Sequence, residues 1–297
     1  MWHLPIAVNR NKEHILFQQM LTGQKSHRIL SLCAEGGQGK SWLLDSFSHH
    51  CRQSNTPRGL VRFASDQPTD PLDCMRNLAE HLGETHFAEF HQLDYELHHP
   101  QAVINIAAHS VETAVSIEAT VTEQSSIKQV AGGSIISTGD ITVNPNQSPE
   151  HRAYVLRRLT KVFKQALTTL AESSPVVLLF DAFEHVPSTT ADWVQKELLS
   201  LIRSATVPNL VVVLAGRPKA HPSNLSNPHE WQGWLKELKR LSPFTSEEVQ
   251  LYFIERCQLH HLDPETVYKA YYEPCKNNPM LMGQLAESWQ VNEWNDL

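Results

Sequence analysis

Apolar positions in the first hundred residues alternate between the spacing of a helix and the spacing of a strand. Residues 11–21 place three apolar side chains on one helical face before a glycine. The elements that follow are predicted as a strand over 28–33, a helix over 40–51, a strand over 59–65 and a helix over 71–82. Such an alternation is typical of βαβ units and predicts a parallel sheet.

The pattern changes between about residues 100 and 149, where charged residues become scarce and Val, Ile, Ser and Thr dominate. Residues 134–143 resemble two strands joined by a turn at Gly139-Asp140. We interpret this segment as an insertion in the α/β unit. Two hypotheses stay open for it, a flexible Ser/Thr-rich loop and a β-rich adaptor or self-association element.

The α/β alternation returns after the insertion. Two unbroken apolar runs, 175–181 and 209–216, are typical of buried parallel strands. The other predicted elements are helices over 150–172 and 191–204, a short strand over 238–241, and helices over 245–257, 264–272 and 280–293. The last quarter of the chain is therefore expected to be a small helical unit.

Composition narrows the class of protein. The chain has 297 residues, of which 41% are hydrophobic and 19% charged, and its formal net charge is -7. These values are typical of a globular protein, and no apolar run is long enough to predict a membrane span. The acidic balance makes nucleic acid an unlikely partner.

The cysteines and histidines do not predict a metal or redox site. The five cysteines are an odd number without the close pairs of zinc or redox motifs, and no leader peptide is recognisable, so we expect a reduced, cytoplasmic protein. The 17 histidines include three adjacent pairs, but neighbouring residues point in different directions on a helix or strand. We interpret them as surface residues rather than metal ligands.

A phosphate-loop motif occupies residues 34–41, Ala-Glu-Gly-Gly-Gln-Gly-Lys-Ser, between a predicted strand and a predicted helix. In such a loop, backbone N–H groups surround phosphate oxygens at the start of a helix. Lys40 is predicted to reach the β- and γ-phosphates, and Ser41 to ligate Mg²⁺. The alternative is a glycine-rich linker.

Acidic residues follow the apolar strand over 175–181. Asp181 ends this strand and is predicted to hold Mg²⁺ through water, while Glu184 lies three residues further on, where it could polarise an attacking water molecule. The alternative for Glu184 is an acid that complements a helix N-terminus. Arg217 ends the next apolar strand, and is either a sensor of the γ-phosphate or a surface arginine in an ion pair.

Five features in this order resemble the STAND-class ATPases, the AAA-related signalling ATPases that include the NACHT and NB-ARC groups. They are the start Val8-Asn9-Arg10 with Glu13, the phosphate loop, Asp181-Ala182-Phe183-Glu184, Ala215-Gly216-Arg217-Pro218, and the lid sequences Leu241 to Val249 and Asn277-Asn278-Pro279. The resemblance covers nearly the whole chain outside the insertion. Two departures, His185 in place of a second acid and Asn277 in place of the usual Gly, indicate slow hydrolysis or a nucleotide switch with little turnover.

The resemblance implies a P-loop NTPase with a mostly parallel five-stranded sheet. Residues 1–220 would form the NTPase domain, and residues 221–297 the last strand and a helical lid. ATP or ADP with Mg²⁺ are the implied cofactors. The implied catalytic residues are Glu184, Lys40 and Arg217; Ser41 and Asp181 would hold Mg²⁺; and the nucleotide would be bound by Arg10, Glu35, Gly36, Gly37, Gln38, Gly39, Lys40, Ser41, Trp42 and Pro279.

The expected function is an ATP-binding switch in which closure of the lid controls binding of a protein partner or a second copy. The resemblance suggests antiphage or stress signalling as the setting. Two rivals stay open: a non-hydrolysing, nucleotide-bound scaffold that acts through the insertion, and a DNA-loading AAA-type ATPase. The acidic balance disfavours the DNA-loading reading, although the helix over 150–172 carries a basic cluster.

Overall fold

The computed structural model describes residues 10–63, 69–98, 103–104, 126–129, 135–138, 141–142, 149–204, 206–218, 231–238, 241, 245, 247–248, 265, 269 and 278–284. They form two compact units. One is drawn from residues 1–87 and 163–297, and the other from residues 88–162.

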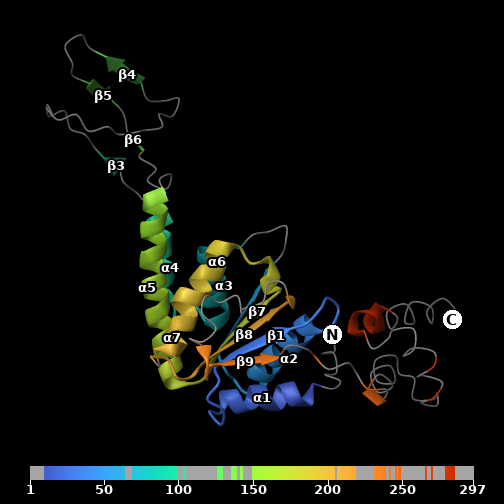
Figure 1. Ribbon diagram of the computed structural model, residues 1–297. Helices are drawn as coiled ribbons and strands as arrows, with labels where there is room; N and C mark the ends of the chain where they lie inside the picture. Colours follow the sequence, from blue (N-terminus) through green and yellow to red (C-terminus); the bar gives the residue numbers. More distant parts are fainter. Residues whose placement is uncertain are drawn as a thin grey trace, which may run out of the picture. The chain divides into compact units, whose positions relative to one another are not determined.

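The first unit is built on a five-stranded sheet in which every neighbouring pair of strands is parallel (Figure 1). Its strand order is β2 (Arg58–Arg62), β7 (Val176–Asp181), β8 (Leu210–Gly216), β1 (Ile29–Cys33) and β9 (Leu235–Leu238). The α/β class and the mostly parallel five-stranded sheet predicted from the sequence are thereby confirmed. All residues of β1, β7 and β8 are buried, as their unbroken apolar sequences require.

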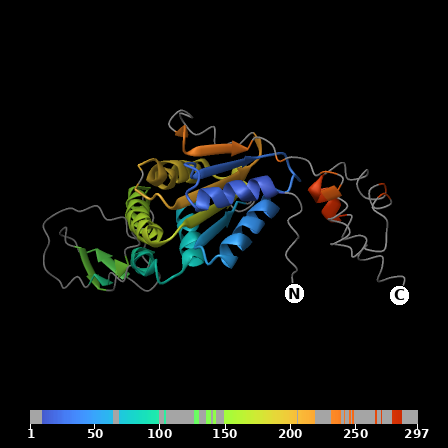
Figure 2. The ribbon, with the colours of Figure 1, turned by 90° about the horizontal axis from the view of Figure 1, so that it is seen from below.

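Helices cover both faces of this sheet. On one face lie α1 (Asn11–Leu21) and α2 (Lys40–Gln53), which appear together in Figures 1 and 2. Phe17 of α1 stacks on Phe47 of α2 with ring centroids 4.2 Å apart and planes 9° from parallel, and both belong to a cluster with alternate residues of β1, β7 and β8. Burying two such rings drives the docking of α1 and α2 onto the sheet.

On the other face, α3 (Pro71–Leu82) packs against the edge strand β2. Asp70 caps α3 by accepting a hydrogen bond from the Asp73 amide, and Pro71 occupies the first turn, where no amide donor is needed. The backbone N–H of Leu60 in β2 donates to His81 Nδ1 of α3 at 3.4 Å. Gly59 permits this approach, because a Cβ there would lie 2.6 Å from Leu78 Cδ2.

The predicted helix over 191–204 is helical but not uniform. It consists of α6 (Ser188–Trp193), a π-helical stretch (Val194–Leu198) and α7 (Leu199–Arg203). A long helix, α5 (Pro149–Ser173), follows the insertion as predicted. No helix among the described residues is both long and apolar enough to cross a membrane.

The second unit contains α4 (Ala88–His98), the first part of α5 and two short antiparallel ladders. β3 (Val103–Ile104) pairs with β6 (Ile141–Thr142), and β4 (Ser126–Gln129) pairs with β5 (Ile135–Thr138). The predicted hairpin about Gly139-Asp140 is therefore wrong: its two strands exist but pair with other partners. Pairing β5 with β4 forms four residue pairs, whereas β6 offers only two residues.

Two further differences concern helix α4, which the sequence analysis missed, and the last strand. β9 covers Leu235–Leu238 instead of residues 238–241. Its register is set by the preceding turn, since the carbonyl of Trp234 accepts from the amides of Arg28 and Ile29 at the start of β1. Most residues of the predicted lid helices over 245–257, 264–272 and 280–293 lie outside the described ranges. Residues 279–284, at the start of the last of these, are helical.

Candidate functional site

The carboxyl ends of the central strands bring the predicted site residues to one edge of the sheet. Cys33, which ends β1, is in register with Gly216, which ends β8, and Asp181 ends β7. Parallel α/β sheets bind their ligands outside this edge. The phosphate loop, the acidic residues after β7 and Arg217 therefore meet there.

The phosphate loop turns sharply between β1 and α2. Gly37 and Gly39 have φ angles of 78° and 79°, in the left-handed region that favours glycine. Gly39 lies directly before α2 and has no side chain to cap the helix, so the first-turn N–H groups remain available to an anion. A loop of this geometry can hold an anion at the start of α2.

Lys40 lies under the loop with 8% of its surface exposed. Its Nζ donates to the carbonyl oxygens of Ala34 at 2.6 Å and Glu35 at 2.8 Å. Burial lowers the pKa of Lys40 and Arg217 lowers it further, while Glu184 and Asp181 act in the opposite direction. The two carboxylates therefore stabilise the charged form of the Lys40 ammonium group.

Asp181 is a buried carboxylate with 5% of its surface exposed. Its Oδ1 accepts a hydrogen bond from the Ala182 amide at 2.9 Å, and Ala182 has a φ of 53°, which turns the chain sharply after the strand. Its Oδ2 lies 3.9 Å from Arg62 Nε. The carboxylate and the exposed Ser41 hydroxyl are hard oxygen donors of the kind that Mg²⁺ prefers.

Glu184 and Arg217 form a two-point contact across β7 and β8. Glu184 Oε2 accepts from the backbone N of Arg217 at 3.1 Å, and its Oε1 lies 3.1 Å from Arg217 Nε. The Arg217 guanidinium also lies over the phosphate loop, because a Cβ at Gly36 would come within 3.3 Å of its Nη2. One guanidinium thus lies between the loop and the carboxylate.

Residues from both ends of the chain contact the loop. The Met280 amide donates to the Gly37 carbonyl at 3.2 Å, and the Pro279 ring lies 3.6 Å from the position of a Cβ at Gly39. Arg10 is 2% exposed and its Nη2 donates to the Gln38 carbonyl at 3.3 Å. Burial lowers the pKa of Arg10, while Glu13 and Glu248 raise it.

The structure therefore places Arg10, Glu184, Arg217 and Pro279 around the loop of residues 35–41. Asp181 ends β7, which β8 separates from β1, the strand that leads into this loop. Trp42 is partly buried in the first turn of α2. Sequence reasoning missed Arg62 and Asp45, which pair with each other near Asp181. The only signal for Arg62 was a cation inside the predicted strand 59–65, because its neighbours depend on the strand order.

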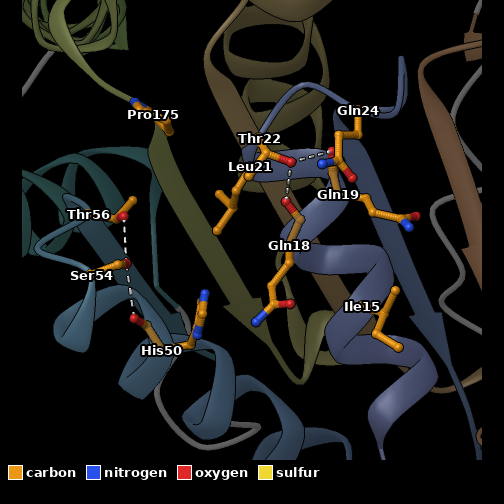
Figure 3. Close-up of a pocket in the computed structure, with 10 residues that line it drawn as sticks. All are labelled: Ile15, Gln18, Gln19, Leu21, Thr22, Gln24, His50, Ser54, Thr56 and Pro175. Atoms are coloured by element: carbon orange, nitrogen blue, oxygen red, sulfur yellow. Dashed lines mark hydrogen bonds between the residues drawn. The ribbon is translucent and has the colours of Figure 1, made fainter.

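A separate pocket of ≈ 510 Å³ lies near the amino ends of β2 and β7, between α1 and the end of α2 (Figure 3). This is the sheet edge opposite to the phosphate loop. Apart from His50, its lining has no titratable side chain; it consists of Ile15, Gln18, Gln19, Leu21, Thr22, Gln24, His50, Ser54, Thr56 and Pro175.

Comparison with solved structures identifies a shared fold. The chain is similar to Cdc6p from Pyrobaculum aerophilum, with a TM-score of 0.55 and 10% sequence identity. The similarity covers 99% of this chain and 65% of that chain, so this chain spans just under two thirds of the length of Cdc6p. No protein-family model and no curated protein matches the sequence. The α/β architecture is therefore one that this chain shares with Cdc6p.

Proposed function

We propose that this chain binds ATP at the loop 34–41 and works as a slowly hydrolysing signalling switch of the STAND type. The observation that carries the proposal is the meeting of the phosphate loop, the buried Asp181 and the Glu184–Arg217 pair at one edge of the sheet. The α/β fold that the chain shares with Cdc6p supports a ligand site at this edge of the sheet.

Phosphate binding in this proposal requires Lys40 to change partners. Its ammonium group now donates hydrogen bonds to two backbone carbonyl oxygens of the loop. Phosphate oxygens would replace these carbonyls, because a charged acceptor forms a stronger hydrogen bond. The first-turn amides of α2 contribute further donors, and their dipole favours the anion. The side chain is positioned for this exchange because its stem is already buried beneath the loop.

Ser41 and Asp181 are the residues that would hold magnesium beside the phosphates. A bound Mg²⁺ would supply positive charge that offsets the negative charge of the phosphates. The Ala182 amide fixes one oxygen of Asp181 and leaves the other directed toward Arg62 and the site. This arrangement orients the carboxylate before a cation arrives.

Glu184 and Arg217 link hydrolysis to the presence of phosphate. While Arg217 occupies both carboxylate oxygens, Glu184 is poorly placed to accept a proton from water. A γ-phosphate near Gly36 would attract the same guanidinium and release Glu184. The competition accounts for the slow turnover that we propose.

The segment around Pro279 supplies the lid. Residues 1–220 would form the nucleotide-binding domain and residues 221–297 the last strand and lid, with Arg10 and Pro279 beside the adenine. Since Met280 already bonds to Gly37, a nucleotide that alters the loop would alter the lid as well. We propose lid closure as the output, read by a protein partner or a second copy.

The same Glu184–Arg217 pair favours a second candidate, a nucleotide-bound scaffold that does not hydrolyse ATP. In that case Arg217 stays on Glu184 and the insertion binds the partner. A turnover assay on the purified chain with ATP and Mg²⁺ distinguishes the two candidates.

The primary test is Lys40→Ala, with Lys12→Ala on the exposed side of α1 as the control for loss of one positive charge. We expect the first variant to lose most of its ATP affinity, measured by calorimetry, and to keep its melting temperature within a few degrees. The control should bind like the wild type. Equal ATP affinity in all three proteins would eliminate the phosphate-loop assignment.

The acidic residues should give distinct phenotypes. Asp181→Asn should weaken retention of nucleotide only when magnesium is present, because it removes the carboxylate charge that would hold the metal through water. Glu184→Gln should leave binding nearly intact and reduce turnover, since the amide cannot accept the proton from water. Wild-type turnover in Glu184→Gln would remove Glu184 from the reaction.

A further inference from the structure

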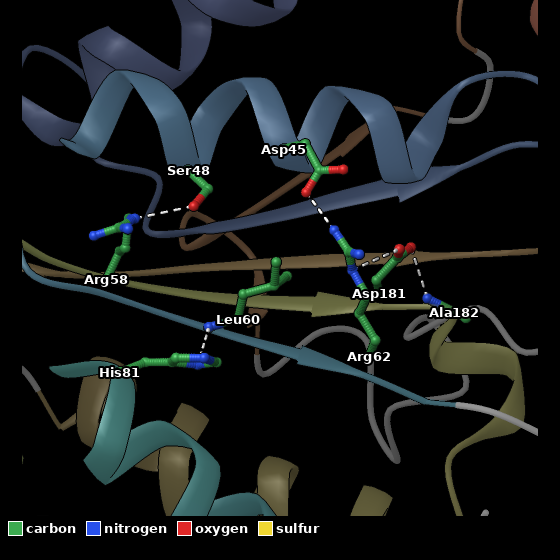
Figure 4. A network of polar contacts seen from close by, with 8 residues as sticks. All are labelled: Asp45, Ser48, Arg58, Leu60, Arg62, His81, Asp181 and Ala182. Carbon is green, nitrogen blue, oxygen red and sulfur yellow. Dashed lines mark hydrogen bonds and ion pairs between the residues drawn. The ribbon is translucent and has the colours of Figure 1, made fainter. Parts of the chain in front are cut away.

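A basic residue lies in the part of the site that is proposed to hold magnesium. Arg62 is the last residue of β2 and the register partner of Asp181 on β7. Its Nε lies 3.9 Å from Asp181 Oδ2, and its Nη2 forms an ion pair and a hydrogen bond with Asp45 Oδ1 on α2 (Figure 4). One guanidinium thus contacts two carboxylates.

The two carboxylates are not equivalent. The side chain of Asp181 is 7% exposed, whereas those of Arg62 and Asp45 are 54% and 44% exposed. A buried charge needs a nearby opposite charge far more than an exposed one does. Arg62 therefore matters most to Asp181, although its closer contact is with Asp45.

A divalent cation and Arg62 compete for the same oxygen. Mg²⁺ held at the Asp181 carboxylate through water would repel a second cation within a few ångströms. Asp181 Oδ1 is already held by the Ala182 amide, so Oδ2 is the oxygen that faces both cations. Because its side chain is long and half exposed, Arg62 can withdraw toward Asp45 without leaving an unpaired buried charge.

We propose that Arg62 is a positioning residue that balances Asp181 when no divalent cation is bound and moves fully onto Asp45 when Mg²⁺ binds. Asp45 then pairs with the Arg62 guanidinium after it has moved away from Asp181. This inference rests on the proposed magnesium role of Asp181, and it adds a built-in competitor that sets the magnesium affinity of the site.

The exchange predicts opposite effects for its two partners. Arg62→Gln removes the competitor, so Mg²⁺ should bind the ADP complex more tightly, by about two- to fivefold for a half-exposed ion pair. Asp45→Asn leaves Arg62 with Asp181 as its remaining carboxylate, so Mg²⁺ should bind more weakly by a similar factor. When Arg62 is already Gln, Asp45→Asn should have a much smaller effect.

Arg58→Gln is the matched control. Arg58 lies on the same strand and donates through Nε to Ser48 on the same helix at 3.0 Å, so the change removes the same charge without touching Asp181. It should leave the magnesium affinity within about twofold of the wild type, as expected for a distant screened charge. Arg62→Lys, which keeps the charge, should also stay near the wild-type value.

The test is calorimetric titration of the full chain saturated with ADP, using MgCl₂ as the titrant, for the wild type and each variant. A second readout is urea unfolding without divalent cation, in which Arg62→Gln should be less stable than Arg58→Gln because Asp181 has lost its counter-ion. Adding ADP and MgCl₂ should abolish that difference. Neither readout depends on turnover.

Two results overturn the proposal. One is an Arg62→Gln affinity that equals that of Arg58→Gln, and the other is a shift in the same direction for Arg62→Gln and Asp45→Asn. If the wild type binds ADP and the titration with MgCl₂ gives no signal, the magnesium site itself is absent and the proposed function fails with it. If Mg²⁺ binds with an affinity that does not depend on Arg62, only the proposed movement of Arg62 is refuted, and the magnesium site stands.

Discussion

Gly37→Ala tests the contact between the phosphate loop and the segment 278–284. Gly37 has a φ of 78°, and a Cβ built on it would lie 2.9 Å from Asn278 Oδ1 and 3.2 Å from Met280 Cβ. Gly39 is a matched control, since its φ is 79° but its Cβ would lie 3.6 Å from Pro279, an ordinary contact. The two substitutions share the backbone strain and differ in the clash.

The expected magnitudes follow from that difference. A left-handed conformation costs an alanine about 1–2 kcal/mol, so Gly39→Ala should lower the free energy of unfolding by that amount. Gly37→Ala should lose about 1–2 kcal/mol more, because Asn278 must move or the segment must leave the loop. Urea unfolding of both variants, followed by fluorescence, measures the difference.

Asn278→Ala supplies the decisive comparison. By itself it removes the hydrogen bond from the Met280 amide to Asn278 Oδ1 at 3.0 Å, worth about 1 kcal/mol. In combination with Gly37→Ala it should recover at least half of the extra loss, whereas with Gly39→Ala the two losses should add. Equal stability of the Gly37 and Gly39 variants, or additivity in both pairs, would show that the segment does not rest on the loop.

Two further predictions concern stability, and a third concerns the insertion. Burial raises the pKa of Cys51 and of Cys74 to about 12 from an ordinary 9.0, so their stabilisation is complete below pH 9 and is lost as the pH rises toward 12. The free energy of unfolding should fall by about 1.4 kcal/mol per pH unit for each thiol in that window, and a slope unchanged by Cys51→Ala would contradict this. Phe47→Ala should cost about 3–5 kcal/mol in urea unfolding, because the ring is fully buried against Phe17; a loss below 1 kcal/mol would refute the stacked core. Replacing residues 101–146 by a short Gly/Ser linker should preserve ATP binding and remove a protein contact, tested by calorimetry and light-scattering mass, and loss of folding would show that these strands support the sheet.

The sequence predicted those features that depend on neighbours along the chain. The strands at 29–33, 176–181 and 210–216 are unbroken apolar runs, and the phosphate loop is a contiguous motif, so each can be recognised locally. β9 could not be placed, because Leu-Lys-Glu-Leu has little pattern and the Trp234 turn sets its register. The turn at Gly139-Asp140 misled for the opposite reason: β5 pairs with β4, which precedes it closely in the sequence, and β6 pairs with the distant strand β3.

The pairs within the candidate site depend on the order of the strands. Arg62 reaches Asp181 because β2 lies beside β7, and Arg217 reaches Glu184 because β7 lies beside β8. Spacing along the chain predicts neither adjacency, because β2 and β7 are far apart in the sequence and strands that are close in it, such as β7 and β8, need not be neighbours in a sheet. Motifs therefore identified Asp181, Glu184 and Arg217, whereas the order of the strands determined which groups form ion pairs.

The bond from Leu60 to His81 has a consequence for the solubility of the protein. An edge strand with free amides can recruit a strand from another molecule and start aggregation. Here the imidazole occupies one such amide and α3 screens β2 from incoming chains. A side chain at position 81 without a ring nitrogen acceptor, as in His81→Phe, would leave this amide without its partner and this border of the sheet open to strand exchange.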